Sequence, residues 1–160
     1  MPTLNNQLPI DTMRTETRQA IMALEERIRH EVSGSAGSMA PVECPLEHRF
    51  APGIYSRTIF LPAGSLVVGK IHNHAHVNVL SQGRVSVYTE QGPEEFSAPR
   101  TWISEPGTKR VVYTHEDAVW NTIHHNPTNE TDTDKIEEFV IAKTFEAFDA
   151  RQREGLTCLT

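Results

Sequence analysis

Residues 64–83, GSLVVGKIHNHAHVNVLSQG, combine a run of β-branched residues, a cluster of histidines and a turn at each end. His72, His74 and His76 occupy alternate positions, and a second strand-like run, residues 84–88, follows the Ser-Gln-Gly turn. Imidazoles in such a context can bind a metal, exchange a proton near neutral pH or hold an anion. The segment therefore predicts β structure with a functional site at the histidines.

The chain beyond Pro45 alternates short apolar runs with Pro/Gly turns. The turn signals recur every 8–12 residues or so, a spacing typical of a β-sandwich or barrel. The candidate strands are residues 55–61, 66–71, 76–80, 84–89, 94–97, 101–104, 109–114 and 118–124. Short antiparallel strands in this number predict a mainly β, jelly-roll fold.

Helical patterns flank the predicted strands on both sides. Residues 11–32 place Ile21, Leu24 and Ile28 at helical spacing opposite a charged face, which predicts a helix that packs on the domain or on another copy of itself. Residues 134–153 carry a wide aromatic face, which predicts one helix packed on the barrel.

The composition suits one domain with terminal extensions, since the chain has 160 residues. We expect an N-terminal arm, a helix and the flexible linker Ser33–Ser38 over residues 1–38. A barrel over 45–127 and a C-terminal helix with a tail over 128–160 complete the expected organisation.

Charge and hydropathy limit the partners. A net charge of −6 argues against general nucleic-acid binding, which requires a basic face. No apolar run approaches the roughly 20 residues of a spanning helix, so we expect no membrane partner. The N-terminus has no signal-peptide pattern, and Cys44 and Cys158 are far apart, which favours a reduced, cytoplasmic compartment.

The spacing of Gly64, Lys70, His72, His76 and Gly83 resembles the first motif of the cupin family, in which a glycine, five residues, His-x-His, three residues, a glutamate, six residues and a glycine follow one another. Residues 105–110, EPGTKR, resemble the turn of the second cupin motif. The resemblance covers roughly residues 50–125. It implies a single-domain, cupin-type double-stranded β-helix. The wider pattern also resembles small cupin-like proteins encoded in tailed-phage genomes.

The sequence departs from the family's metal-binding pattern at most ligand positions. The leading histidine of the first motif is Lys70, its glutamate is His76, and the histidine of the second motif is Arg110. Thr114 replaces the closing asparagine, so only His72 keeps the family identity. A guanidinium has no lone pair for a metal, so a metal site would need other ligands.

The geometry of His72 and His76 decides between the interpretations of the site. On one unbroken strand these residues would lie about 13 Å apart and could not share a ligand. They converge only if residues 73–75 form a break between two strands, as the cupin motif implies. His74, His124 or a bound molecule would then be the third ligand of a divalent transition metal (Fe, Mn, Ni or Zn). A metal-free pocket, or satisfied polar side chains, is the other interpretation.

Two cationic residues, Lys70 and Arg110, are candidate receptors for an anion. The alternatives are that Lys70 pairs with an acidic neighbour and that Arg110 points to solvent. Lys109 is predicted to face solvent, because neighbours on a strand alternate. Trp120 alternates in phase with His124 and is either a ligand contact or part of the barrel core.

These features are compatible with three functions. The first is a small-molecule or anion-binding cupin, for which the resemblance implies metal-assisted dioxygenation or isomerisation. The second is a regulatory module that binds an anion without turnover. The third is a virion-associated or decoration protein that uses a jelly roll and an N-terminal docking arm, with other virion proteins as partners and with the host cytoplasm or the virion as its location. In each case we expect a homo-oligomer, assembled through the barrel or the N-terminal helix.

Overall fold

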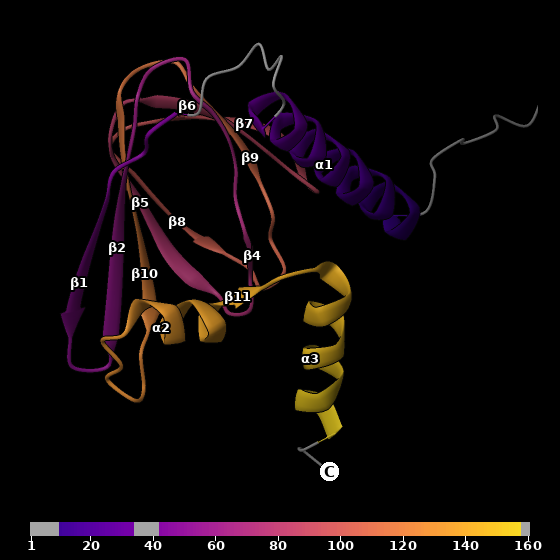
Figure 1. The fold of residues 1–160 in the computed structure, drawn as a ribbon, viewed down its shortest axis with the longest axis vertical. Helices are drawn as coiled ribbons and strands as arrows, with labels where there is room; N and C mark the ends of the chain where they lie inside the picture. The colour runs from indigo at the N-terminus through magenta and orange to yellow at the C-terminus, as the bar shows by residue number, and fades with distance from the viewer. Residues whose placement is uncertain (1–9, 34–41, 158–160) are drawn as a thin grey trace, which may run out of the picture.

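The computed structural model describes residues 10–33 and 42–157, and its centre is a sandwich of two antiparallel sheets (Figure 1). The five-stranded sheet has the order β1 (Leu46–Ala51), β2 (Ile54–Leu61), β10 (Ala118–His125), β5 (His76–Gln82) and β8 (Arg100–Ser104). The four-stranded sheet has the order β3 (Leu66–Val68), β9 (Val111–Thr114), β6 (Arg84–Thr89) and β7 (Gly92–Ser97). The predicted N-terminal arm and most of the predicted linker lie outside the described residues.

A small third sheet and three helices surround one end and one side of this sandwich. The third sheet pairs β4 (Ile71–His72) with β11 (Ile141–Ala142). The helices are α1 (Ile10–Ser33), α2 (Thr133–Val140) and α3 (Phe145–Thr157). Helix α2 lies beneath the end of the sandwich where β4 and β11 meet, and α3 extends away from it (Figure 1).

The predicted strands are present, but one of them is divided, and the predicted C-terminal helix is interrupted. The predicted strand 66–71 is divided into β3 and β4, because Gly69 and Lys70 leave the ladder and the chain crosses from one sheet to another. The single C-terminal helix predicted over 134–153 is wrong. It is interrupted at Ile141 and Ala142, whose backbones pair with His72 and Ile71 of β4. This long-range pairing outweighs the local helical pattern.

The inner face of the five-stranded sheet changes from apolar to polar along the strands. Side chains alternate, so the register places Tyr55 opposite His124 and His76 opposite Ser104 at one end. The opposite end is packed with apolar side chains from both sheets, namely Leu61, Leu80, Val85, Val87, Phe96, Val112, Ala118 and Trp120. The sandwich is therefore closed by a hydrophobic core at one end and lined with imidazoles at the other.

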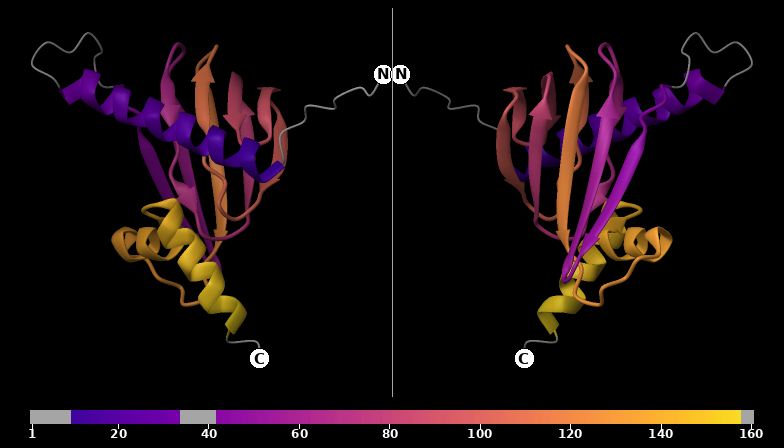
Figure 2. Two further views of the ribbon diagram at one scale, coloured as in Figure 1. Left: turned by 90° about the vertical axis from the view of Figure 1, so that its right-hand side faces the viewer. Right: turned by 90° about the vertical axis from the view of Figure 1, so that its left-hand side faces the viewer.

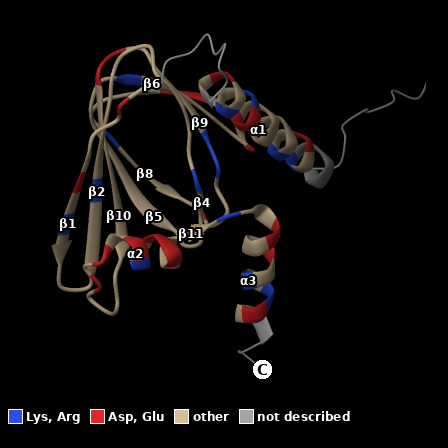
Figure 3. Cartoon of the chain, in the orientation of Figure 1, with Lys and Arg blue, Asp and Glu red and all other residues tan. Residues whose placement is uncertain are grey.

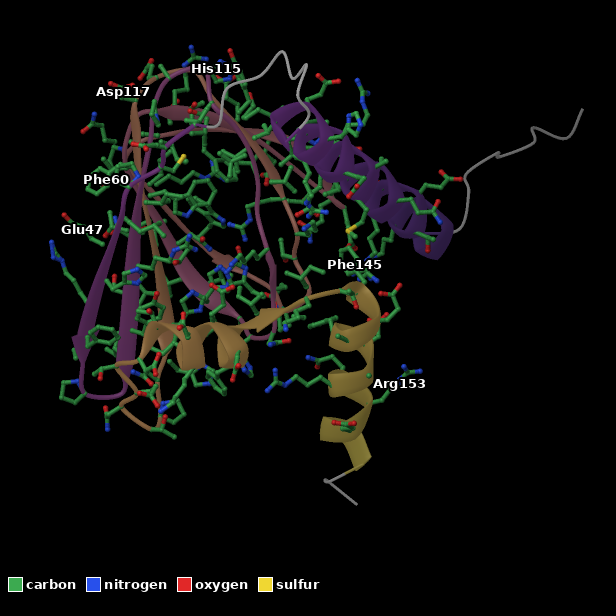
Figure 4. The ribbon with its side chains drawn as sticks, in the orientation of Figure 1. Glu47, Phe60, His115, Asp117, Phe145 and Arg153 are labelled. Carbon is green, nitrogen blue, oxygen red and sulfur yellow. The ribbon has the colours of Figure 1, made fainter. Side chains whose placement is uncertain are left out.

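Helix α1 runs diagonally across one side of the sandwich (Figure 2). Arg14 and Arg18 both form ion pairs with Glu90, in the β6–β7 turn, and Ile21 is almost completely buried. The guanidinium carbon of Arg18 also lies 4.3 Å from the ring centroid of Phe145, which lies at the start of α3 beneath α1 (Figure 4). The helix is thus packed on its own domain, which is one of the two arrangements predicted for it.

In the described part of the chain, no helix combines the length and the apolar character needed to cross a membrane.

Candidate functional site

The chain reverses direction between His72 and His76, as the motif predicts. Strand β4 ends at His72 and β5 begins at His76, and the intervening residues form a turn. Asn73 fixes this turn to the end of α2, because its backbone N–H donates to the Val140 carbonyl at 2.8 Å and its side-chain amide donates to the Phe139 carbonyl at 3.1 Å. The two imidazole centroids are consequently only 4.2 Å apart.

A third imidazole joins this pair from β10. The ring centroid of His124 lies 4.7 Å from that of His76 and 5.4 Å from that of His72. All three residues are buried, with at most 9% of their surface exposed. We call His72, His76 and His124 the imidazole cluster.

Two ring nitrogens of the imidazole cluster are buried without a hydrogen-bond partner among the described residues. They are Nδ1 of His72 and Nε2 of His76. Nδ1 of His76 lies 3.2 Å from the carbonyl oxygen of His74. A carbonyl can only accept, so Nδ1 carries the proton and Nε2 presents a lone pair. The cluster thus holds a buried acceptor that needs a donor from elsewhere.

Burial keeps the imidazole cluster neutral at physiological pH. Desolvation is the main cause, and it lowers the pKa of His76 to about 4 and that of His124 to about 3. The pKa of His72 is lowered further still, first by burial and then by the charges of neighbouring groups that include His76 and Arg110. Lone pairs rather than positive charges therefore line this end of the sandwich.

Acid is expected to destabilise the fold through these imidazoles. Their folded-state pKa values lie below the ordinary value of 6.5, so the unfolded chain binds more protons between about pH 6.5 and pH 3. The stabilisation is complete above pH 6.5 and is lost as the pH falls through this window. For His76 alone the loss is about 2 kcal/mol between pH 8 and pH 5.

Urea unfolding of the wild type and of His76→Gln at pH 8 and pH 5 measures this effect. The variant should show a smaller pH dependence than the wild type, whereas His30→Gln, in the exposed last turn of α1, should keep the full dependence. Equal pH dependence in all three proteins would show that His76 titrates normally in the folded state.

Two of the predicted site residues lie away from the imidazole cluster. The ring of His74 contacts those of His125 and Phe139, with centroid distances of 4.9 and 4.6 Å. Lys70 is exposed, and its ammonium group pairs with Glu137 of α2, which was the alternative prediction for it. His74 lies in the turn between His72 and His76, and Lys70 precedes β4, so neither side chain joins the imidazole cluster.

The arrangement of the candidate donors does not fit a divalent metal. In residues 10–33 and 42–157, no three His, Cys, Asp or Glu side chains are arranged so that they could hold a metal ion. The positive charge of Arg110 also acts on His72 and His76. A second cation at this position would be repelled.

Arg110 points into the sandwich from the segment that precedes β9. It is buried, with 7% of its surface exposed. Its Nη1 donates to Oδ1 of Asn78 at 3.2 Å, Nη2 donates to Oγ of Ser104, and the guanidinium carbon lies 5.4 Å from the ring centroid of Trp120. No aspartate or glutamate of the described residues forms an ion pair with it. Burial lowers its pKa only to about 10, so it remains a cation.

Asn78 organises the groups around Arg110. Its Oδ1 also accepts a hydrogen bond from Nε1 of Trp120 at 3.0 Å, and its Nδ2 donates to Oγ of Ser104 at 2.9 Å. Trp120 belongs at the same time to the apolar core and to this network. Asn78 and Ser104 were not predicted as site residues, although Asn78 is in phase with His76 on β5.

Arg57 is a second cation near the imidazole cluster, in addition to Arg110, and it was not predicted as a site residue. It lies on β2 two residues from Tyr55, so both side chains are on the same face of the strand. Its charge contributes to the lowered pKa of His72 and of His124. The ring of Tyr55 stacks on that of His124 at 5.9 Å, and its hydroxyl lies 2.7 Å from Nδ1 of His48.

The prediction that Lys109 faces solvent is wrong. Lys109 and Arg110 do alternate, but α1 covers the outer side, and Nζ of Lys109 lies 2.9 Å from Oε2 of Glu25. Only 5% of the surface of Lys109 is exposed. The preceding turn is anchored to the site, since the N–H of Gly107 donates to the His72 carbonyl at 2.8 Å.

A cavity of about 650 Å³ reaches this network from the side where β8 and β7 form the free edges of their sheets. Arg110 and Ser104 line it, together with the inward-facing Phe96 and Trp102. Arg14 and Arg18 of α1 line it as well. A ligand can therefore reach the buried arginine without passing the imidazole cluster.

Comparison with known proteins shows a likeness of fold at low sequence identity. No family model and no curated protein matches the sequence. Ectoine synthase from P. lautus is 10% identical, with a TM-score of 0.50 over 68% of this chain and 82% of that one. A cupin-2 domain protein from Shewanella frigidimarina is 10% identical (TM-score 0.42, 50% and 80% of the chains). An RmlC-like cupin from Methanocaldococcus jannaschii is 12% identical (TM-score 0.45, 55% and 84%).

The observed strand order agrees with the fold that the sequence motifs imply, because two antiparallel sheets pair strands that are not consecutive in the chain. At 10% identity the likeness to ectoine synthase concerns the fold alone. The chain therefore has a mainly β, cupin-type double-stranded β-helix fold with an N-terminal helix and C-terminal helices.

Proposed function

We propose that this protein binds a small anion inside the β-sandwich, with Arg110 as the receptor. The observation that carries the proposal is a buried guanidinium with only neutral partners, Asn78 and Ser104. A buried charge without a counter-ion is costly, and native proteins normally pair such a group. A carboxylate or phosphate ligand would provide the missing charge and match the planar fork of the guanidinium.

The surroundings of Arg110 support an anion rather than a cation. Strands β5 and β10, in the interior of the five-stranded sheet, contain no aspartate or glutamate, and both are drawn without red in Figure 3. Arg57 adds a second positive charge near His72 and His124. The interior is thus electropositive although the whole chain is acidic.

The imidazole cluster adds a hydrogen-bond acceptor to this site. The lone pair on Nε2 of His76 can accept a hydrogen bond from a hydroxyl group of the ligand, or take its proton. The divalent metal and the dioxygenase or isomerase activity implied by the family resemblance do not enter this proposal, since no group of described side chains is arranged to hold a metal. Binding is the function that the described residues support best.

Thermal-shift and tryptophan-fluorescence titrations test the proposal. The only tryptophans are Trp102 and Trp120, so the intrinsic fluorescence reports on the site itself. Acetate and phosphate should change the emission and raise Tm in a saturable manner, whereas acetamide, the neutral counterpart of acetate, should not. Sodium chloride at equal ionic strength is the control for screening. A response to acetamide as large as that to acetate, or no saturable response to any anion, would refute anion binding.

A further inference from the structure

The cavity beside Arg110 has room for much more than a carboxylate. Its volume of about 650 Å³ falls in the range of cavities that hold organic ligands of drug size. Arg110 and Ser104 are among its lining residues, and Val87, Phe96 and Trp102 provide apolar side chains on strands of both sheets. A small inorganic anion would occupy only part of this volume.

The apolar wall of the cavity is aromatic and rigid. The ring centroids of Phe96 and Trp102 are 4.6 Å apart, and Trp102 in turn lies 4.9 Å from Trp120. Trp102 is only half-buried, while Phe96 and Trp120 are fully buried in the core behind it. A half-buried aromatic side chain next to a buried cation suits an apolar, preferably planar, ligand body.

The charged residues that line the cavity are four cations and three acids, so the lining itself has a net charge of +1. The cations are Arg14, Arg18, Lys109 and Arg110, and the acids are Glu90, Glu94 and Glu105. Glu90 forms ion pairs with both Arg14 and Arg18, and Lys109 is paired with Glu25 behind the lining. Arg110 alone has no acidic partner among the described residues. A ligand with one negative charge therefore provides the counter-ion that Arg110 lacks, and a second negative charge would lie near the acidic residues of the lining.

From these features we propose that the ligand is an amphipathic monoanion, an organic acid with one carboxylate and an aromatic or bulky apolar body. The carboxylate lies on Arg110 and Ser104, and the body lies against Phe96 and Trp102, beside the first turns of α1. This inference rests on the proposed anion-binding function and specifies the class of its ligand.

A matched series of probes on the full-length wild type tests the class of ligand. Naphthalene-2-carboxylate, acetate, naphthalene-2,6-dicarboxylate and 2-naphthol are compared by the concentration dependence of Tm. The monocarboxylate is expected to bind at least tenfold more tightly than acetate, because it also buries its rings. The dicarboxylate and the neutral naphthol should each bind at least tenfold more weakly than the monocarboxylate.

Variants assign the two parts of the ligand to the two parts of the cavity. Trp102→Leu should weaken naphthalene-2-carboxylate severalfold and leave acetate unchanged, and Arg49→Met, on the exposed strand β1, should change neither. The comparison among probes in the wild type stands if Trp102→Leu does not fold. Equal affinity for acetate and the naphthoate, or tighter binding of the dicarboxylate, overturns this inference alone. The absence of binding by every anion overturns the proposed function as well.

Discussion

Arg110→Met is expected to raise the free energy of unfolding of the unliganded protein by about 1–3 kcal/mol, because methionine has a similar length and carries no charge that must be desolvated. The polar groups that bind Arg110 in the wild type keep other hydrogen-bond partners in the variant. Oδ1 of Asn78 keeps the hydrogen bond from Trp120, and Oγ of Ser104 keeps the one from Asn78. The same substitution removes the proposed receptor for the ligand's charge, so anion affinity should fall by about 100-fold or more.

Opposite changes in stability and binding distinguish a binding residue from a structural one. Urea unfolding gives the first quantity and fluorescence titration with acetate the second. Arg49→Met is the matched control, since Arg49 is exposed on β1 and pairs with Glu47, and it should change the free energy of unfolding by less than about 0.5 kcal/mol. An ordinary substitution lowers the free energy of unfolding by about 1 kcal/mol. If Arg110→Met lowers it by more than about 2 kcal/mol and leaves acetate binding unchanged, Arg110 has a structural role instead.

Gly83→Ala is expected to be the most destabilising single substitution among the glycines of the described residues. Gly83 connects β5 to β6 with φ +88°, and a Cβ there would lie 2.5 Å from the Asp117 carbonyl oxygen and 2.8 Å from Cα of Ala118. Both neighbours are backbone atoms of the turn into β10 and cannot rotate away. The positive φ and the clash together should cost about 3 kcal/mol or more, which lowers Tm by roughly 6–12 °C.

Gly53→Ala separates the two contributions. Gly53 has a similar φ of +74°, but no atom lies within 4 Å of a Cβ built there. Its alanine variant should therefore lose only the 1–2 kcal/mol or so of the left-handed backbone. Calorimetry on both variants measures the difference. Equal losses would mean that the β10 turn relaxes around the new methyl group, and that the close approach at Gly83 is not rigid.

The barrel could be predicted because its signals are local. Pro/Gly turns separate the strands, and the alternation in β2, β5 and β10 identifies the buried face. Strand β1 escaped prediction because Glu47 and Arg49 alternate with Leu46 and Phe50 on an edge where every residue is exposed, so the pattern lacks a buried face. The interruption of the C-terminal helix follows from pairing with β4, which is some 70 residues away in the chain and has no local signal.

The site was predictable only in part, because local sequence patterns do not indicate long-range contacts. The spacing of His72 and His76 indicated the reversal, and the alternation after Gly107 indicated that Lys109 and Arg110 face opposite sides. The elements that cover each side of this segment depend on tertiary packing. The partner of Lys109 lies on α1 and that of Lys70 lies on α2, and the sequence near the lysines does not predict either contact.

Lys109 and Arg110 point in opposite directions, so the number of residues in their segment determines which side chain faces the interior. Each added or removed residue between Gly107 and β9 exchanges inside for outside, because an extended chain has a period of two. A protein of this kind with one residue fewer would bring the lysine inwards and offer a compact point charge in place of a flat, two-pronged donor. Whether this segment has an odd or an even number of residues therefore determines, as much as residue identity does, which ligands such a pocket can recognise.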